Sequence, residues 1–284
     1  MFFYIYLGIG LLGSGWIVYR SDVQNFFAGA GLFLLYALLI YLALFVLQVL
    51  VFAVVSLTIN VNNLPKSIHG FYRFMGFETT LMFMKTLHIR VHLHGLEHMP
   101  ESEPYLLVSN HRSIFDPLVG LIYLKKYDIA FISKQENLKI PFVGRYIAAV
   151  GCLPLDRENP KSAIKSIKKA AENIKSGYAN YGIYPEGWEN KSHDPLLPFR
   201  SGAFKIAKDA GCQIVMSAIR NSDHIFRRAF TFRPIHIHLD ILGTIPPEIV
   251  KAEKTGELSE RAFRVMEEFL TEHPADDWKL GRRG

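Results

Sequence analysis

Charge is almost absent from the first part of this 284-residue sequence. Residues 1 to 59 contain only Arg20 and Asp22, whereas the other 225 residues carry the remaining 56 charged side chains, about 25% of that stretch. That share is ordinary for a soluble domain, but 59 nearly uncharged residues do not stay exposed to water. The composition therefore excludes intrinsic disorder and a purely soluble protein, and it predicts an apolar segment joined to a polar domain.

Cysteine is also scarce, since the chain has only Cys152 and Cys212 and no CxxC pair. This excludes a small disulfide-stapled protein and favours two buried thiols in a reducing compartment. All of the formal net charge of +6 belongs to the polar part, because Arg20 and Asp22 cancel. Such a surface attracts phosphate groups. Because no nucleic-acid motif accompanies the basic residues, we predict anionic lipid and no nucleic acid as the partner.

Two apolar runs, at 2–19 and 26–59, are each long enough to enter a bilayer, for which about 20 residues are needed. A helix over the second run would be ~50 Å long, so we expect it to be tilted, broken near Gly29 or Gly31, or continued outside the membrane. The first run lacks the basic start of a signal peptide. We therefore predict that residues 1–66 form a hydrophobic membrane anchor, either a spanning hairpin or a re-entrant pair of helices.

Basic residues follow the second apolar run closely, among them Lys66, Arg73 and Lys85. By the positive-inside rule this predicts that residues 67–284 lie on the cytoplasmic side of a membrane. Residues 67–90 mix these cations with large apolar side chains, which is typical either of an interfacial helix or of a helix that caps the domain core.

The rest of the chain alternates short β-rich runs with helical patterns. This alternation predicts an α/β fold with a mixed, largely parallel sheet flanked by helices. Strands are expected at 105–109, 129–133, 152–155, 181–184, 213–218 and 235–242, and helices at 117–126, 138–149, 160–176 and 202–210.

A histidine and an aspartate lie where the first of these strands gives way to a helix. Ligands of open α/β sheets bind at the carboxyl ends of strands, where His111 is expected. Asp116 is predicted to be the helix N-cap and Pro117 the first helical residue. The loop can bring the carboxylate onto the imidazole, which fixes one tautomer and makes the other nitrogen of His111 a general base. A capping aspartate beside an unrelated histidine is the alternative for this pattern alone.

Further polar residues follow other predicted strands. In the sequence YPEG at 184–187, proline and glycine mark a tight turn, so Glu186 is expected at the strand end, with an exposed turn as the alternative. Lys134 and Arg157 also lie just past strand ends, and the planar fork of arginine fits a phosphate. A surface pair of Asp156 and Arg157 would contribute little to stability.

The polar residues around His111, from Lys134 to Arg157 and around Glu186 form three groups along the chain. In this order the three groups resemble the motifs of the glycerolipid acyltransferase family, over roughly residues 85–245. The best-known members of that family are the 1-acylglycerol-3-phosphate acyltransferases. The first motif is matched by Asn110-His111 with Asp116, the second by Lys134, Pro141, Gly144, Gly151, Asp156 and Arg157, and the third by Tyr184-Pro185-Glu186-Gly187. The segment Leu197-Pro198-Phe199-Arg200-Ser201-Gly202-Ala203 resembles the one that follows in the family.

The resemblance implies acyl transfer from acyl-CoA or acyl carrier protein to a hydroxyl of lysophosphatidic acid, giving phosphatidic acid. His111 and Asp116 would be the catalytic pair, without a covalent acyl-enzyme, a bound cofactor or a metal. The chain contains no GxSxG nucleophile elbow, which agrees with that scheme. The implied substrate-binding residues are Asn110, Lys134, Arg157, Pro185, Glu186, Gly187 and Arg200.

The sequence departs from the family after Gly187, where Trp188 and Glu189 replace the usual threonine and arginine. An anion thus takes the place of a cation beside the acceptor phosphate. Two alternatives stay open: an acyltransferase for another lysolipid or a non-phosphate acceptor, and a non-catalytic membrane lipid-binding protein. The alternating histidines of 92–94 and 236–238 are explained by a half-exposed strand face, so we predict no metal site there.

Overall fold

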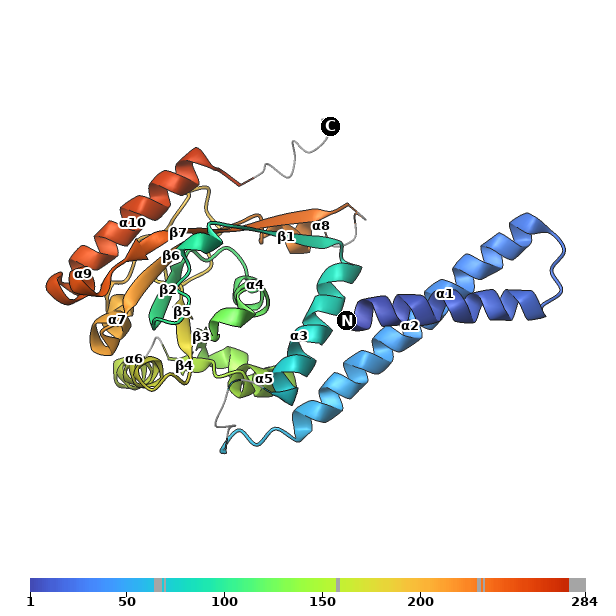
Figure 1. The fold of residues 1–284 in the computed structure, drawn as a ribbon, viewed down its shortest axis with the longest axis horizontal. Helices are drawn as coiled ribbons and strands as arrows, with labels where there is room; N and C mark the ends of the chain where they lie inside the picture. Colours follow the sequence, from blue (N-terminus) through green and yellow to red (C-terminus); the bar gives the residue numbers. More distant parts are fainter. Residues whose placement is uncertain (64–67, 69, 157–158, 229–230, 232, 276–284) are drawn as a thin grey trace.

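The structure is a computed structural model that describes residues 1–63, 68, 70–156, 159–228, 231 and 233–275. Figure 1 shows a helical hairpin that projects from an α/β part. The hairpin consists of α1 (Phe2–Arg20) and α2 (Phe26–Leu57), both long and apolar enough to cross a membrane. Because α2 is one continuous helix of 32 residues, the alternative of a break near Gly29 or Gly31 is wrong. Its length is ~48 Å, which exceeds a hydrocarbon core of ~30 Å.

Polar contacts join the hairpin to the next helix, α3 (Phe71–Thr86). In the middle of α2, the buried Gln48 side chain donates to Thr79 Oγ1 at 2.8 Å and accepts from the Tyr6 hydroxyl at 2.7 Å. A buried amide is stable only when its donors and acceptors are satisfied. These two bonds therefore fix the positions of α1 and α2 relative to α3.

The base of α2 contacts α5 (Val143–Ala149). The rings of Phe52 and Tyr146 stack with centroids 4.0 Å apart, and the Tyr146 hydroxyl donates to the Phe52 carbonyl. Arg145 Nη1 donates to the Ile59 carbonyl at 3.0 Å. The hairpin is thus attached to the α/β part at two places, on α3 and on α5.

A seven-stranded sheet forms the centre of the α/β part, with the strand order β1-β7-β6-β2-β5-β3-β4. The sheet is parallel except between β6 and β7, which pair antiparallel. The predicted mixed, largely parallel sheet is therefore confirmed. The strands are β1 (Ile89–His94), β2 (Tyr105–Ser109), β3 (Ile129–Lys134), β4 (Leu153–Leu155), β5 (Asn180–Ile183), β6 (Gln213–Arg220) and β7 (Ile235–Ile245).

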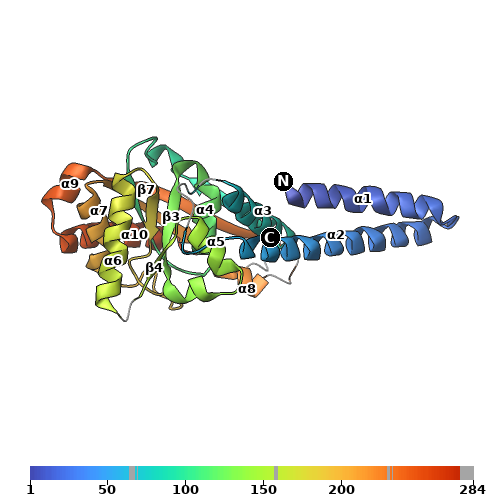
Figure 2. The same ribbon diagram turned by 90° about the horizontal axis from the view of Figure 1, so that it is seen from below.

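Helices cover the sheet, as Figures 1 and 2 show. The predicted helices are found with shifts of a few residues at their ends, whereas α8, α9 and α10 were not predicted. The last two follow β7, and α10 buries an apolar stripe that includes Leu258, Ala262 and Met266. The α-helices are α4 (Asp116–Tyr123), α6 (Pro160–Lys175), α7 (Lys205–Ala210), α8 (His224–Arg228), α9 (Pro247–Ala252) and α10 (Thr255–Glu272).

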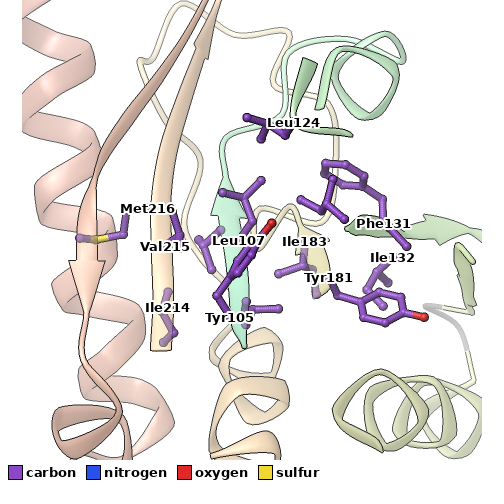
Figure 3. Packing of buried hydrophobic residues seen from close by; sticks show 14 of the residues in the cluster. Tyr105, Leu107, Leu124, Phe131, Ile132, Tyr181, Ile183, Ile214, Val215 and Met216 are labelled. Atoms are coloured by element: carbon purple, nitrogen blue, oxygen red, sulfur yellow. The ribbon is translucent and has the colours of Figure 1, made fainter. Parts of the chain in front are cut away.

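The core lies around β2, the central strand of the sheet. All five residues of β2 are buried, because a strand covered by helices on both faces carries apolar side chains on both. Figure 3 shows Tyr105 and Tyr181 among these side chains. Their hydroxyls donate to the carbonyls of Tyr127 and Gly151, each at 2.9 Å. The packed core thus holds the carboxyl ends of β2, β5 and β6 at one edge.

Candidate active site

The predicted histidine and aspartate meet at that edge. His111 follows β2, and its Nδ1 lies 2.9 Å from Asp116 Oδ2. The same carboxylate oxygen accepts the backbone N–H groups of Arg112, at 2.6 Å, and Ser113, at 2.9 Å. Asp116 is only 1% exposed, and these bonds replace the hydration of Oδ2. The loop is thereby curled around the carboxylate and presents the His111 ring in one orientation.

Helix α4 begins one residue earlier than the sequence pattern predicts. Asp116 is its first residue, and Phe115 is the N-cap, without a side-chain cap bond. The predicted capping role is therefore wrong: the Asp116 carboxylate turns back to the loop N–H groups instead of capping the helix. Pro117 still occupies the first turn, where its missing N–H costs nothing.

Glu186 connects two loops at the same edge. Its Oε1 accepts the backbone N–H of His111 at 2.6 Å, and its Oε2 accepts that of Leu197 at 2.9 Å. The side chain is 3% exposed, which excludes the solvent-exposed turn. Burial raises the pKa of Glu186 to about 7, although the two N–H bonds and the nearby His111 and Arg112 oppose that rise. Both oxygens of this carboxylate are used to hold the backbone next to the histidine.

Aromatic packing supports the other side of the histidine ring. The rings of His111 and Tyr184 stack with centroids 4.3 Å apart, and Tyr184 in turn stacks on Phe131 at 5.6 Å. Burial, with the Asp116 carboxylate nearby, raises the pKa of Tyr184 well above its usual value. Tyr184 therefore stays a neutral support for the imidazole at physiological pH.

The turn after β5 brings Arg200 to the site. Its backbone N–H donates to the carbonyl of the buried Pro185 at 2.9 Å. Gly187 has a φ of +80°, and a Cβ at this position would lie 2.9 Å from Arg200 Nε. Only glycine fits both the left-handed backbone and the close approach of the exposed arginine. Pro185, Glu186, Gly187 and Arg200 thus form one connected turn beside His111.

Asn110 bonds the end of β2 to β6. Its Nδ2 donates to the Ile219 carbonyl at 3.0 Å, and its Oδ1 accepts the Ile219 N–H at 2.7 Å. The side chain is fully buried between the two strands. The predicted binding residue therefore fixes the strand end that carries His111.

Of the two phosphate-binding residues predicted from the second motif, the structure describes Lys134, which lies apart from this group. Lys134 ends β3, two positions from β2 in the sheet, and its Nζ lies 3.6 Å from Glu136 Oε2. Arg157 lies outside the described residues. Glu189, the anion that departs from the family pattern, has Lys191 Nζ at 3.8 Å. A nearby lysine thus offsets part of its charge.

A cleft of about 770 Å³ lies beside the histidine loop. Asn110 and Arg112, the neighbours of His111 in the chain, line it together with Asp223 and Arg227. Asp223 Oδ2 lies 3.9 Å from Arg112 Nη2 and 3.8 Å from Arg227 Nη1. Asp223 was not among the predicted site residues, and the signal for it in the sequence is its position a few residues after the predicted strand at 213–218.

The alternating histidines face one another across β1 and β7. His92 Nε2 lies 2.8 Å from His236 Nδ1, and His94 Nε2 lies 3.3 Å from His238 Nδ1. Within the described part of the chain, no group of three or more His, Cys, Asp or Glu side chains is arranged to hold a metal ion. These rings are cross-strand partners on a half-exposed face.

Most of the sheet, the His111–Asp116 pair and the loops around them lie within one region that matches a known family. Residues 90–220 match the family model described as Acyltransferase. This region, a little under half of the chain, is therefore similar to that family, in agreement with the resemblance seen in the sequence motifs.

Known proteins similar to this chain carry more particular names. It is 29% identical over 188 residues to 1-acyl-sn-glycerol-3-phosphate acyltransferase alpha of Ovis aries, over 66% of this chain and 65% of that one. It is 37% identical over 124 residues to the chloroplastic 1-acyl-sn-glycerol-3-phosphate acyltransferase BAT2 of Brassica napus, over 43% of this chain and 35% of that one. The matched parts thus span less than two thirds of these relatives.

A solved structure shares the fold. It is the crystal structure of the 1-acyl-sn-glycerophosphate (LPA) acyltransferase PlsC from Thermotoga maritima, with a TM-score of 0.56 and 21% identity. The similarity covers 97% of this chain and 95% of that one, and so includes the helical hairpin.

Proposed function

We propose that this protein is a 1-acyl-sn-glycerol-3-phosphate acyltransferase, which makes phosphatidic acid from lysophosphatidic acid and an acyl thioester. The observation that carries the proposal is the 2.9 Å contact between His111 Nδ1 and the buried Asp116 carboxylate, at the place of the first family motif. The names of the similar proteins support the choice of acceptor. The donor is proposed to be acyl-CoA or acyl carrier protein.

In the proposed mechanism, His111 Nδ1–H donates to Asp116, which leaves Nε2 as the general base. Nε2 takes the proton from the acceptor hydroxyl while the hydroxyl oxygen attacks the thioester carbonyl. The tetrahedral intermediate then expels the thiolate, which receives the proton from the imidazolium. Asn110, Pro185, Glu186 and Gly187 would keep the backbone around His111 in place.

Cations near the turn would bind the acceptor phosphate. We propose Arg200 for this role, and the resemblance adds Lys134 and Arg157 of the second motif as further candidates. Residues 1–66 would anchor the protein in a membrane, and residues 67–284 would form the catalytic domain on its cytoplasmic side. Anchoring keeps both amphiphilic lipids at the bilayer surface during the reaction.

The test is acyl transfer by the purified full-length protein to a panel of lysolipids, with acyl-CoA and acyl carrier protein donors. His111→Ala is expected to remove activity without unfolding the protein, whereas the matched control His98→Ala, an exposed position, keeps it. A preference for an uncharged acceptor would refute the phosphatidic acid assignment. Absence of donor turnover by the wild-type protein would favour the non-catalytic lipid-binding alternative instead.

A further inference from the structure

Large apolar side chains are exposed at the rim of the candidate active site. Phe226, in α8 just after β6, is 64% exposed, and Ile114, in the loop that carries His111, is 55% exposed. Phe115 connects the two, because its ring centroid lies 5.2 Å from that of Phe226. Loops from two neighbouring strands thus present apolar groups side by side at one edge of the sheet.

Cations directly follow the exposed aromatic ring. Arg227, whose side chain is half exposed, and Arg228 are the last two residues of α8. An aromatic ring beside arginines suits the boundary of a bilayer, where the ring enters the acyl region and the guanidinium groups meet lipid phosphates. A cationic surface of this kind is complementary to anionic lipid.

The position of α8 relative to the hairpin points to the same partner. Figures 1 and 2 both place α8 at the end of the α/β part from which the hairpin projects. Helix α3 lies at that end too, and its Phe71 and Phe74 are exposed. Helices α3 and α8, which both carry exposed aromatic side chains, thus lie at the end of the α/β part from which the apolar hairpin projects.

We propose that this end of the domain, formed by Ile114, Phe226, Arg227 and the exposed phenylalanines of α3, rests on an anionic bilayer with Phe226 inserted. This rests on the membrane anchoring proposed above. The loop with His111 then opens at the lipid surface, so an acyl acceptor reaches the imidazole without leaving the membrane.

The two native cysteines make a site-specific test possible, because both are buried and free. A cysteine introduced by Phe226→Cys in the full-length protein is labelled with an environment-sensitive fluorophore. The protein is reconstituted in vesicles of phosphatidylcholine and phosphatidylglycerol, with or without brominated acyl chains. Leu38→Cys, in the exposed middle of α2, reports anchoring, and Glu248→Cys, in α9 at the far end of both views, is the matched control.

Brominated lipid is expected to quench the labels at 226 and 38 by about twofold or more and to leave the label at 248 nearly unchanged. If the label at 38 is quenched but the label at 226 is quenched no more than the label at 248, the proposed contact of α8 with the bilayer is refuted, while the membrane anchor stands. If the label at 38 is not quenched, the membrane anchoring is refuted, and the proposed contact of α8 with the bilayer is refuted with it.

An activity measurement gives an independent check. Phe226→Asp is expected to lower turnover of vesicle-embedded lysophosphatidic acid several-fold, while turnover of a short-chain, water-soluble acceptor stays within about twofold. Equal losses on both acceptors, or no loss on either, would overturn the proposal.

Discussion

Replacing Glu186 by glutamine tests how the candidate site is held together. The carboxylate accepts one backbone N–H on each oxygen, from His111 and from Leu197. Glutamine keeps the shape of the side chain but offers only one acceptor. Its amide NH₂ would face one of the two N–H groups, and a buried donor without an acceptor costs about 1–3 kcal/mol at any pH.

The carboxylate adds a contribution that depends on pH. Its pKa rises from 4.5 in the unfolded chain to about 7 in the fold, which corresponds to about 3 kcal/mol. Because the folded state binds the proton more tightly, the free energy of unfolding is largest below pH 4.5 and falls as the pH rises to about 7. Glutamine carries no such proton, so the variant lacks this decline.

The expected result is a difference in stability between the two proteins that depends on pH. Near pH 5 the wild-type protein is more stable than Glu186→Gln, and between pH 5 and 8 the difference in the free energy of unfolding shifts by about 3 kcal/mol in favour of the variant. The assay is unfolding of the full-length protein in one detergent between pH 5 and 8. Glu189→Gln, a carboxylate on the same loop, is the control. Parallel stability curves for wild type and Glu186→Gln would refute the account of a buried, pKa-shifted carboxylate.

Three further substitutions test the neighbouring contacts. Asp116→Asn keeps an acceptor for the loop N–H groups but no longer fixes the imidazole tautomer, so acyl transfer should fall roughly 10²- to 10⁴-fold with unchanged circular dichroism; near-normal rates would contradict the catalytic pair. Asn110→Ala removes both bonds to Ile219 and should destabilise the protein by about 2–4 kcal/mol in denaturant unfolding, and a loss below about 0.5 kcal/mol would contradict the strand-bridging role. Gly187→Ala combines a φ of +80° with a Cβ 2.9 Å from Arg200 Nε, so it should cost about 1–2 kcal/mol and raise the KM for the lysolipid; unchanged thermal stability and KM would show that the turn tolerates a side chain.

Much of the architecture could be predicted because it is encoded locally. An apolar run long enough for a bilayer, or alternation of β-rich and helical segments, is visible in the residues themselves. The meeting of His111 with Asp116 was also predictable, since only four residues separate them and a helix start limits the path of the loop. The continuous α2 was not, because a helix tolerates single glycines when their neighbours favour it.

The remaining features depend on residues that are far apart in the chain. The sequence alone determined that an apolar segment precedes an α/β domain and that His111 and Asp116 stand at a strand end. Only the tertiary structure decided that Glu186, 75 residues beyond His111, accepts its N–H, and that Asn110 bonds Ile219 across two strands. The physical reason is that burial and long-range hydrogen bonds arise from packing, whereas sequence periodicity reports only which face of an element is apolar.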